Sequence, residues 1–161
     1  MKDLILKDVL EYYSKKDISQ IDHTIKVAYF TKTIAKLENY SIKDIEFLEI
    51  VALLHDIGCP LSKEKYGNTI PKNQEKEGMC VAKEILSQEK YIEISEEIKE
   101  KITKIVGSHH QKAKAIEFNF APLFDADTII NTLESYHKDS LISRKLLITD
   151  SGKDIFNKIY K

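Results

Sequence analysis

The amino-acid sequence predicts an all-α protein, and three features lead to that class. Apolar residues recur at three- and four-residue spacing along most of the 161-residue chain, which is the period of a helix. No segment keeps the alternation of apolar and polar residues that is typical of a strand. The chain has only 3 Pro and 5 Gly, which suits helices better than a turn-rich sheet protein. We therefore expect a helical bundle.

Apolar spacing and capping residues indicate three helices in the first part of the chain. Apolar residues over 4–13 indicate the first. Ser19 is a suitable N-cap for the second, in which apolar residues recur over 27–37. Ser41, followed by an aspartate three residues later, resembles a capping box that begins the third. The third helix becomes apolar on nearly every side at 50–54, so we expect it to be buried.

A loop is expected after this buried helix. Gly58 and Pro60 are predicted to end the helix. Residues 61–73, which include Gly67 and Pro71, are the longest irregular segment that the sequence predicts. Long ordered loops in compact domains often have a function, so we expect this segment to border the functional site.

Further helices are predicted in the second half of the chain. The fourth covers about 74–86, and the fifth starts near Ser95, where two glutamates suit its positive end. A polar connection follows at 113–119. A sixth helix is expected at 123–136 and a short last helix at 154–160.

Composition limits the class of protein. Residues 1–161 have the length of one domain without repeats or linkers, and we place its core at about 19–137. With 25 Lys+Arg and 26 Asp+Glu, the net charge of −1 provides no reason to expect duplex nucleic acid or a membrane as the main partner. Cys59 and Cys80 are too few for a disulfide framework, and no targeting segment is apparent. A cytoplasmic location is therefore expected, and a homodimer is compatible with the sequence.

Several polar residues fall on helix faces that we expect to be buried. His23 shares its face with the apolar residues of the second helix, and His55 does so in the third. Asp56 follows at the end of that third helix. His109 continues the apolar face of the fifth helix, and Asp127 lies among apolar residues of the sixth. Four helices therefore each contribute a His or an Asp to the interior.

Taken singly, each of these residues is more often an ordinary core histidine or a capping carboxylate than a ligand. Together they pose an electrostatic problem, because an unpartnered buried carboxylate is costly and no Lys or Arg shares these faces. A divalent cation resolves this problem, since imidazole and carboxylate are its usual ligands. The combination therefore predicts a metal site.

The same residues resemble the signature of a known family. The order His23, His55–Asp56 and Asp127 resembles the H…HD…D pattern of the HD-domain superfamily, and LLHDIG at 53–58 is its most recognisable phrase. DHTIKVA around His23 and DADTII around Asp127 resemble the helices of its first and last ligands. The motifs KYG, QEKEG and GSHH add a closer resemblance to small phosphohydrolases of the HDIG type. The resemblance covers roughly residues 23–133.

The resemblance implies a bundle of about five core helices around a divalent metal ion. Four ligands are implied: His23, His55, Asp56 and Asp127. Asp125 competes for the last place, and Asp127 is preferred because it directly precedes the TII run. Two-metal relatives have a histidine where this chain has Gln74, so one ion (Fe, Mn, Ni or Zn) is favoured over two and Gln74 is assigned to substrate binding.

The resemblance also implies hydrolysis of phosphate esters by a metal-activated water. We expect Asp56 to orient this water, and His109 or His110 to stabilise the phosphate or protonate the leaving group. His109 and His110, with Glu77 as a carboxylate partner, are alternatively the ligands available to a second ion. Lys65 is the cation that we expect to contact the phosphate of the substrate.

The function that these residues favour is a phosphohydrolase acting on a nucleotide or another small phosphorylated substrate. Two alternatives stay open. One is a di-iron HD-type oxygenase, against which Gln74 counts, and the other is a metal- or nucleotide-binding regulatory module without turnover. Cys59 lies beside the expected site, but no base is paired with it in the sequence, so no covalent step is expected.

Overall fold

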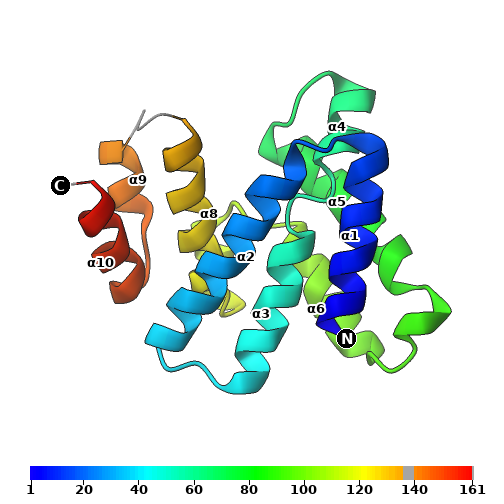
Figure 1. The fold of residues 1–161 in the computed structure, drawn as a ribbon, viewed down its shortest axis with the longest axis horizontal. Coiled ribbons are helices and arrows are strands. Elements are labelled where there is room, and N and C mark those ends of the chain that lie inside the picture. Colours follow the sequence, from blue (N-terminus) through cyan, green and yellow to red (C-terminus); the bar gives the residue numbers. More distant parts are fainter. Residues whose placement is uncertain (136–139, 161) are drawn as a thin grey trace.

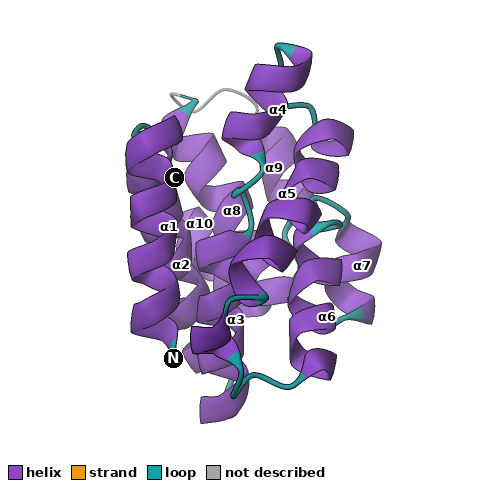
Figure 2. Cartoon of the chain, turned by 90° about the vertical axis from the view of Figure 1, so that its right-hand side faces the viewer, coloured by secondary structure: helices purple, strands orange, loops and turns teal. Residues whose placement is uncertain are grey.

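The computed structural model describes residues 1–135 and 140–160, and within these residues it contains helices and no strand. The all-α class is therefore confirmed. Tyr136, the expected last residue of the sixth helix, lies outside the described residues, as does the expected end of the core at residue 137. The elements follow one another with short connections (Figure 2): α1 (Lys2–Lys16), α2 (Gln20–Leu37), α3 (Ile42–Leu54), α4 (Cys59–Tyr66), α5 (Pro71–Leu86), the 3₁₀ turn η1 (Glu89–Tyr91), α6 (Glu96–Val106), α7 (Lys112–Glu117), α8 (Ala121–Glu134), α9 (Ser140–Leu146) and α10 (Asp150–Ile159).

Of the two predicted N-caps, one is formed and one is not. The Ser41 side chain accepts a hydrogen bond from the backbone N–H of Asp44, and Ser95 does the same for α6. Ser19 occupies the N-cap position of α2, but its hydroxyl donates to the Asp17 carboxylate at 2.5 Å. This competing local hydrogen bond is the reason that Ser19 does not cap the helix.

The prediction of a long loop over 61–73 is wrong, because α4 begins one residue after Gly58. Pro60 stands in the first turn of α4, where a missing backbone N–H has no cost and the fixed φ suits a helix. Gly67 ends α4 in the left-handed conformation, with φ of 69°. Only residues 67–70 connect α4 to α5.

Two other boundaries differ from prediction near the C-terminal end. The expected polar connection over 113–119 contains the short helix α7. The last helix begins at Asp150, earlier than expected, because the Thr149 hydroxyl accepts a hydrogen bond from the N–H of Gly152 and so caps α10. The helix α9 was not predicted at all, and none of its described side chains is buried.

The centre of the bundle is formed by α2, which packs against α3 on one side and α8 on the other (Figure 1). The N-terminal α1 lies against α3, while α9 and α10 lie at the other end, against α8. The helix α6 contacts α3, and α5 packs against both α6 and α4. No helix in the described part of the chain is long and apolar enough to cross a membrane.

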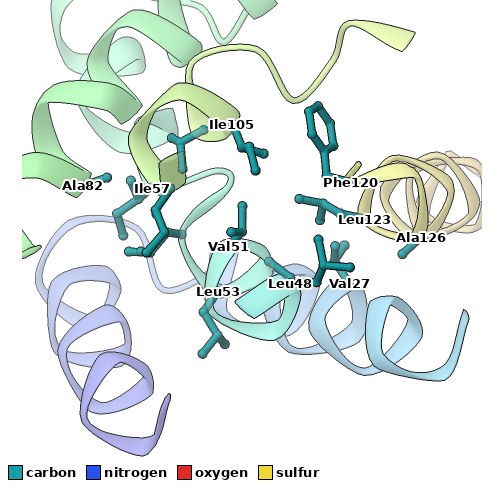
Figure 3. Close-up of a cluster of buried hydrophobic side chains, with 14 of the residues drawn as sticks. Val27, Leu48, Val51, Leu53, Ile57, Ala82, Ile105, Phe120, Leu123 and Ala126 are labelled. Carbon is teal, nitrogen blue, oxygen red and sulfur yellow. The ribbon is translucent and has the colours of Figure 1, made fainter. Parts of the chain in front are cut away.

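The apolar core joins side chains from α2, α3, α6 and α8 (Figure 3). Val27, Val51 and Ile105 are completely inaccessible to solvent, and Leu48 and Leu123 are 1 % exposed. As predicted, the C-terminal part of α3 is buried on nearly every side, so the residues that follow it lie in the middle of the molecule. This arrangement carries His55 into the interior.

Candidate metal centre

Four side chains converge at the centre of the bundle: His23 from α2, His55 and Asp56 from the turn after α3, and Asp127 from α8. His23 Nε2 lies 3.3 Å from His55 Nε2, 3.4 Å from Asp56 Oδ2 and 3.3 Å from Asp127 Oδ1. His55 Nε2 lies 3.5 and 3.6 Å from the same two carboxylate oxygens. Ligand atoms about 2.1 Å from one ion are separated by roughly 3.0–3.4 Å at octahedral to tetrahedral angles. The cluster therefore has the size of a coordination site.

The other ring nitrogens of the two histidines fix how the rings face the cluster. His55 Nδ1 donates to the carbonyl oxygen of Ala52 at 2.7 Å, and His23 Nδ1 lies 2.8 Å from Glu134 Oε2. Each ring therefore directs its Nε2 towards the centre, which is how second partners orient metal-binding histidines. The two Nε2 atoms face each other at 3.3 Å, and only a proton or a cation between them relieves the repulsion of their lone pairs.

The two buried carboxylates of the cluster, Asp56 and Asp127, also favour a cation. Burial alone would raise the pKa of Asp56, but His55, His109 and His23 hold it well below its usual range. Burial would also raise the pKa of Asp127, but hydrogen bonds with His23 and His55 hold it below its usual range. Burial would lower the pKa of His23, but the two carboxylates raise it to about 11. Among the described residues no Lys or Arg lies within 4 Å of either carboxylate, so a divalent ion would replace protons that the imidazoles otherwise hold.

Asp56 also faces a third histidine on its other side. His109 Nδ1 donates to the carbonyl oxygen of Val106 at 2.8 Å, which directs Nε2 to within 3.2 Å of Asp56 Oδ1. Both atoms are buried and lack a hydrogen-bond partner among the residues that the structure describes. Asp56, His109 and His110 can bring one ligand atom each within 4.8 Å of one another. These unpartnered atoms fit a metal ion better than they fit a closed protein core.

His110 belongs to a different chain of contacts. The Cys59 thiol donates to Gln74 Oε1 at 2.7 Å, and Gln74 Nε2 lies 2.7 Å from His110 Nε2. His110 Nδ1 lies 3.2 Å from Glu75 Oε1, which also accepts from the backbone N–H of His110. The Nε2 atom of His110 therefore accepts a hydrogen bond from Gln74, whereas the Nε2 atom of His109 makes no hydrogen bond with the described residues.

Cys59 is held as a neutral thiol. Burial and the charge of Asp56 raise the pKa of Cys59 above its ordinary value. Only the thiolate is a strong nucleophile. The structure therefore gives Cys59 a hydrogen-bonding role towards Gln74 and provides no means of activating it.

Two of the predicted substrate- and metal-binding residues lie apart from the cluster. The Lys65 ammonium pairs with Glu77 Oε2 at 2.7 Å, and Glu77 also accepts from the Tyr66 hydroxyl. The expected pairing of Glu77 with the histidines is therefore wrong, because Glu75 is the carboxylate that contacts His110. Lys65 does not line the cavity beside the metal centre, since the helical geometry of α4 directs it to Glu77.

A polar cavity of about 400 Å³ opens beside the cluster. Lys63 is the lysine among its described lining residues. Lys63 lies four residues after Cys59 on α4, and its ammonium pairs with Asp17 at 2.6 Å. The sequence predicts a loop here, and a loop has no regular face that would place Lys63 beside Cys59. The cavity is lined by Ser19, Gln20, Asp22, His23, Asp56, Cys59, Lys63, Thr69, Gln74, His110, Asn131 and Glu134.

Two orienting residues of α8 were missed in the sequence. Asn131 donates to Asp127 Oδ1 at 2.8 Å, and Glu134 contacts His23 as described above. They follow Asp127 by four and seven residues, so all three lie on one face of the helix. This spacing is the signal from which both could have been predicted.

Asp125, the competitor of Asp127, has a different role. It is fully buried and accepts from the backbone N–H groups of Ile148 and Thr149, each at 2.8 Å, and from the Thr149 hydroxyl at 2.6 Å. It therefore fastens the segment before α10 to α8. The structure brings Asp127, and not Asp125, to the histidine cluster.

Comparison with known proteins agrees with this geometry. The family model described as HD domain matches residues 21–150, which include all four residues of the cluster. Searches of curated proteins and of solved structures gave no match.

Proposed function

The chain belongs to the HD-domain family, and we propose that it is a metal-dependent phosphohydrolase acting on a nucleotide or another small phosphate ester. HD domains are generally metal-dependent hydrolases. The observation that carries the proposal is the convergence of His23, His55, Asp56 and Asp127, with both imidazole Nε2 atoms turned to one point. We propose that these four residues hold one divalent ion, whose identity among Fe, Mn, Ni and Zn is open.

The chain's own residues then have distinct tasks. A bound divalent ion supplies a nucleophile by lowering the pKa of water and offsets negative charge on the phosphate. Asp56 has one oxygen in the cluster and its other oxygen 3.2 Å from His109 Nε2, so we propose that it orients the water without taking its proton. His109 does not line the polar cavity, and its Nε2 lies 3.2 Å from Asp56 Oδ1, so we propose that it holds this carboxylate in position. Lys63, and not the expected Lys65, lines the cavity, and we propose that it exchanges its pairing with Asp17 for the phosphate of the substrate.

A second ion is less well supported, because Gln74 already engages Nε2 of His110. His110 and Gln74 both line the cavity, so we propose that they contact the substrate. Because His110 Nε2 accepts from the Gln74 amide and its Nδ1 proton is directed to Glu75, we propose that His110 positions Gln74 and the substrate and becomes a proton donor only when the substrate displaces Gln74.

The test is phosphate release by metal-loaded protein from nucleotides and small phosphate esters, with Asp127→Asn and Asp56→Asn alongside. Both variants should lose activity by at least about a hundredfold, since each removes a ligand charge. Lys65→Ala is the matched control, because Lys65 lies outside the cavity, and it should keep full activity. Oxygen-dependent turnover with two bound irons would favour the oxygenase, and metal binding without any turnover would favour a regulatory module.

A further inference from the structure

Two hydroxyl groups of α1 and α2 are buried without a hydrogen-bond partner in the described part of the chain. They belong to Tyr13, which is completely inaccessible to solvent, and to Thr24, which is 2 % exposed. Neither residue lines the polar cavity at the metal centre, so solvent in that cavity does not solvate them. Burial of a hydroxyl without a hydrogen bond is costly, and each of these two groups therefore requires a partner.

The fold brings the two hydroxyls together next to the metal centre. Tyr13 belongs to the buried face of α1, and Thr24 directly follows the proposed ligand His23 on α2. Burial raises the pKa of the Tyr13 hydroxyl well above its ordinary value, the charge of Asp56 adds to this rise, and contact with Thr24 lowers it. Tyr13 therefore lies in contact with Thr24 and within the electrostatic reach of Asp56, although neither hydroxyl has the geometry of a hydrogen bond.

A water molecule is the partner that suits these groups. Buried water molecules typically make about three hydrogen bonds to polar groups that the protein leaves unsatisfied. Tyr13, Thr24 and the carboxylate of Asp56 offer this number. The two hydroxyls can each donate or accept, and the carboxylate accepts. Phe and Val would fill nearly the same space without an unpaired hydroxyl, so a packing role alone does not account for Tyr13 and Thr24.

We infer that Tyr13 and Thr24 bind one buried water molecule, and that this water donates a hydrogen bond to Asp56 and helps to hold its carboxylate in place at the metal centre. The terminal torsion of a carboxylate is soft, so an additional partner restricts its rotation. Tyr13 and Thr24 are then positioning residues that act on the metal through Asp56. Their effect on the metal rests on the proposed function, whereas the binding of the water does not.

Thermal unfolding of the metal-free protein tests whether the water is bound. Tyr13→Phe and Thr24→Val each remove one hydroxyl with little change of shape. Each should lower the unfolding temperature, and the double variant should lose less than the sum of the two, because both substitutions disrupt the same water. An unfolding temperature that is unchanged or higher in both single variants would overturn the inference, as would losses that add up fully.

Thr31→Val is the matched control for Thr24→Val. Thr31 is completely buried on the same helix, and its hydroxyl likewise makes no hydrogen bond with another described residue. It follows Thr24 by seven residues, which corresponds to about 10 Å along the helix axis, so it cannot share this water. Its effect on the unfolding temperature should add to that of Tyr13→Phe, and its metal affinity should equal that of the unsubstituted protein.

Competition with a chromophoric chelator tests the effect on Asp56 without any substrate. Tyr13→Phe and Thr24→Val should each weaken metal binding by about tenfold, whereas Thr24→Ser, which keeps the hydroxyl, should retain the affinity. Equal affinities of the Val and Ser variants would contradict the positioning of Asp56 by the water. If the unsubstituted protein binds no metal, the proposed function fails instead, and the unfolding experiment still decides whether the water is bound.

Discussion

Two buried aspartates, two residues apart on α8, have opposite tasks. Asp127 faces the histidine cluster, and Asp125 satisfies backbone donors of another segment. Asp125→Ala should lower the free energy of unfolding by about 2–4 kcal/mol, because it leaves buried N–H groups without acceptors. Asp127→Ala should instead abolish metal retention. Denaturant titration and metal analysis of the folded fraction check both, and loss of metal from folded Asp125→Ala protein would reverse the assignment.

Glu134 orients His23 although it does not reach the cluster itself. Glu134→Ala should weaken metal binding by about 10–100-fold, as is typical when a carboxylate partner of a ligating histidine is removed. Glu134→Gln should weaken it less, since its amide oxygen still accepts from Nδ1. Competition with a chromophoric chelator measures both affinities. Unchanged affinity in Glu134→Ala would show that the contact with His23 is unimportant.

Protons and the metal compete for His23. Its pKa is raised to about 11 against burial by Asp127 and Asp56, so the metal-free ring is protonated at neutral pH. A metal ion must displace that proton, and the affinity should therefore rise by about tenfold per pH unit between about pH 6 and 8. Metal titrations across this range, with the proton release measured in parallel, check the sign. An affinity independent of pH would contradict a protonated His23.

At the scale of elements, the turn after α3 approaches the backbone of α5 closely. A Cβ atom at Gly58 would lie 2.2 Å from the carbonyl oxygen of Gln74 and 2.3 Å from the backbone nitrogen of Gly78. Both are backbone atoms, so the two elements must separate to admit it. This contact holds Asp56 and Gln74 in register on neighbouring elements.

Gly58→Ala should therefore lower the free energy of unfolding by roughly 3 kcal/mol and weaken metal binding at the same time. Gly67→Ala is the control, because φ at Gly67 is 69° but no atom lies within 4 Å of its Cβ position. It should cost only about 1 kcal/mol and leave metal binding intact. Thermal unfolding and metal analysis of both variants compare them, and equal effects would exclude a packing role for Gly58.

The sequence predicts elements well where the signal is local, and poorly where it is not. The cap at Ser41, the start of a helix near Ser95 and the buried C-terminal part of α3 follow from neighbouring residues, and all are confirmed. The sequence predicts a loop where α4 lies because Pro60 is typical of a helix end, whereas it stands in the first turn of a new helix. The competing bond from Ser19 to Asp17 shows that a suitable residue type does not guarantee a cap.

At the scale of the whole molecule, residues on four different helices could be predicted to face inward because each shares an apolar face. Periodicity places His23, His55 and Asp127 in the interior, and all three are buried. It does not reveal which partners meet there. The pairing of Lys65 with Glu77 and the contact of Gln74 with His110 depend on how α4, α5 and the turn after α6 pack together. Such contacts join residues that have no fixed spacing in the chain.

The central claim is that the four-residue cluster holds a divalent ion, and metal analysis of freshly purified protein tests it most directly. The unsubstituted protein should contain about one equivalent of Fe, Mn, Ni or Zn, and added metal should raise its unfolding temperature. His55→Ala removes a fully buried ligand and should lose both the metal and this stabilisation. A protein that contains no metal, and that takes up none on addition, would contradict the account.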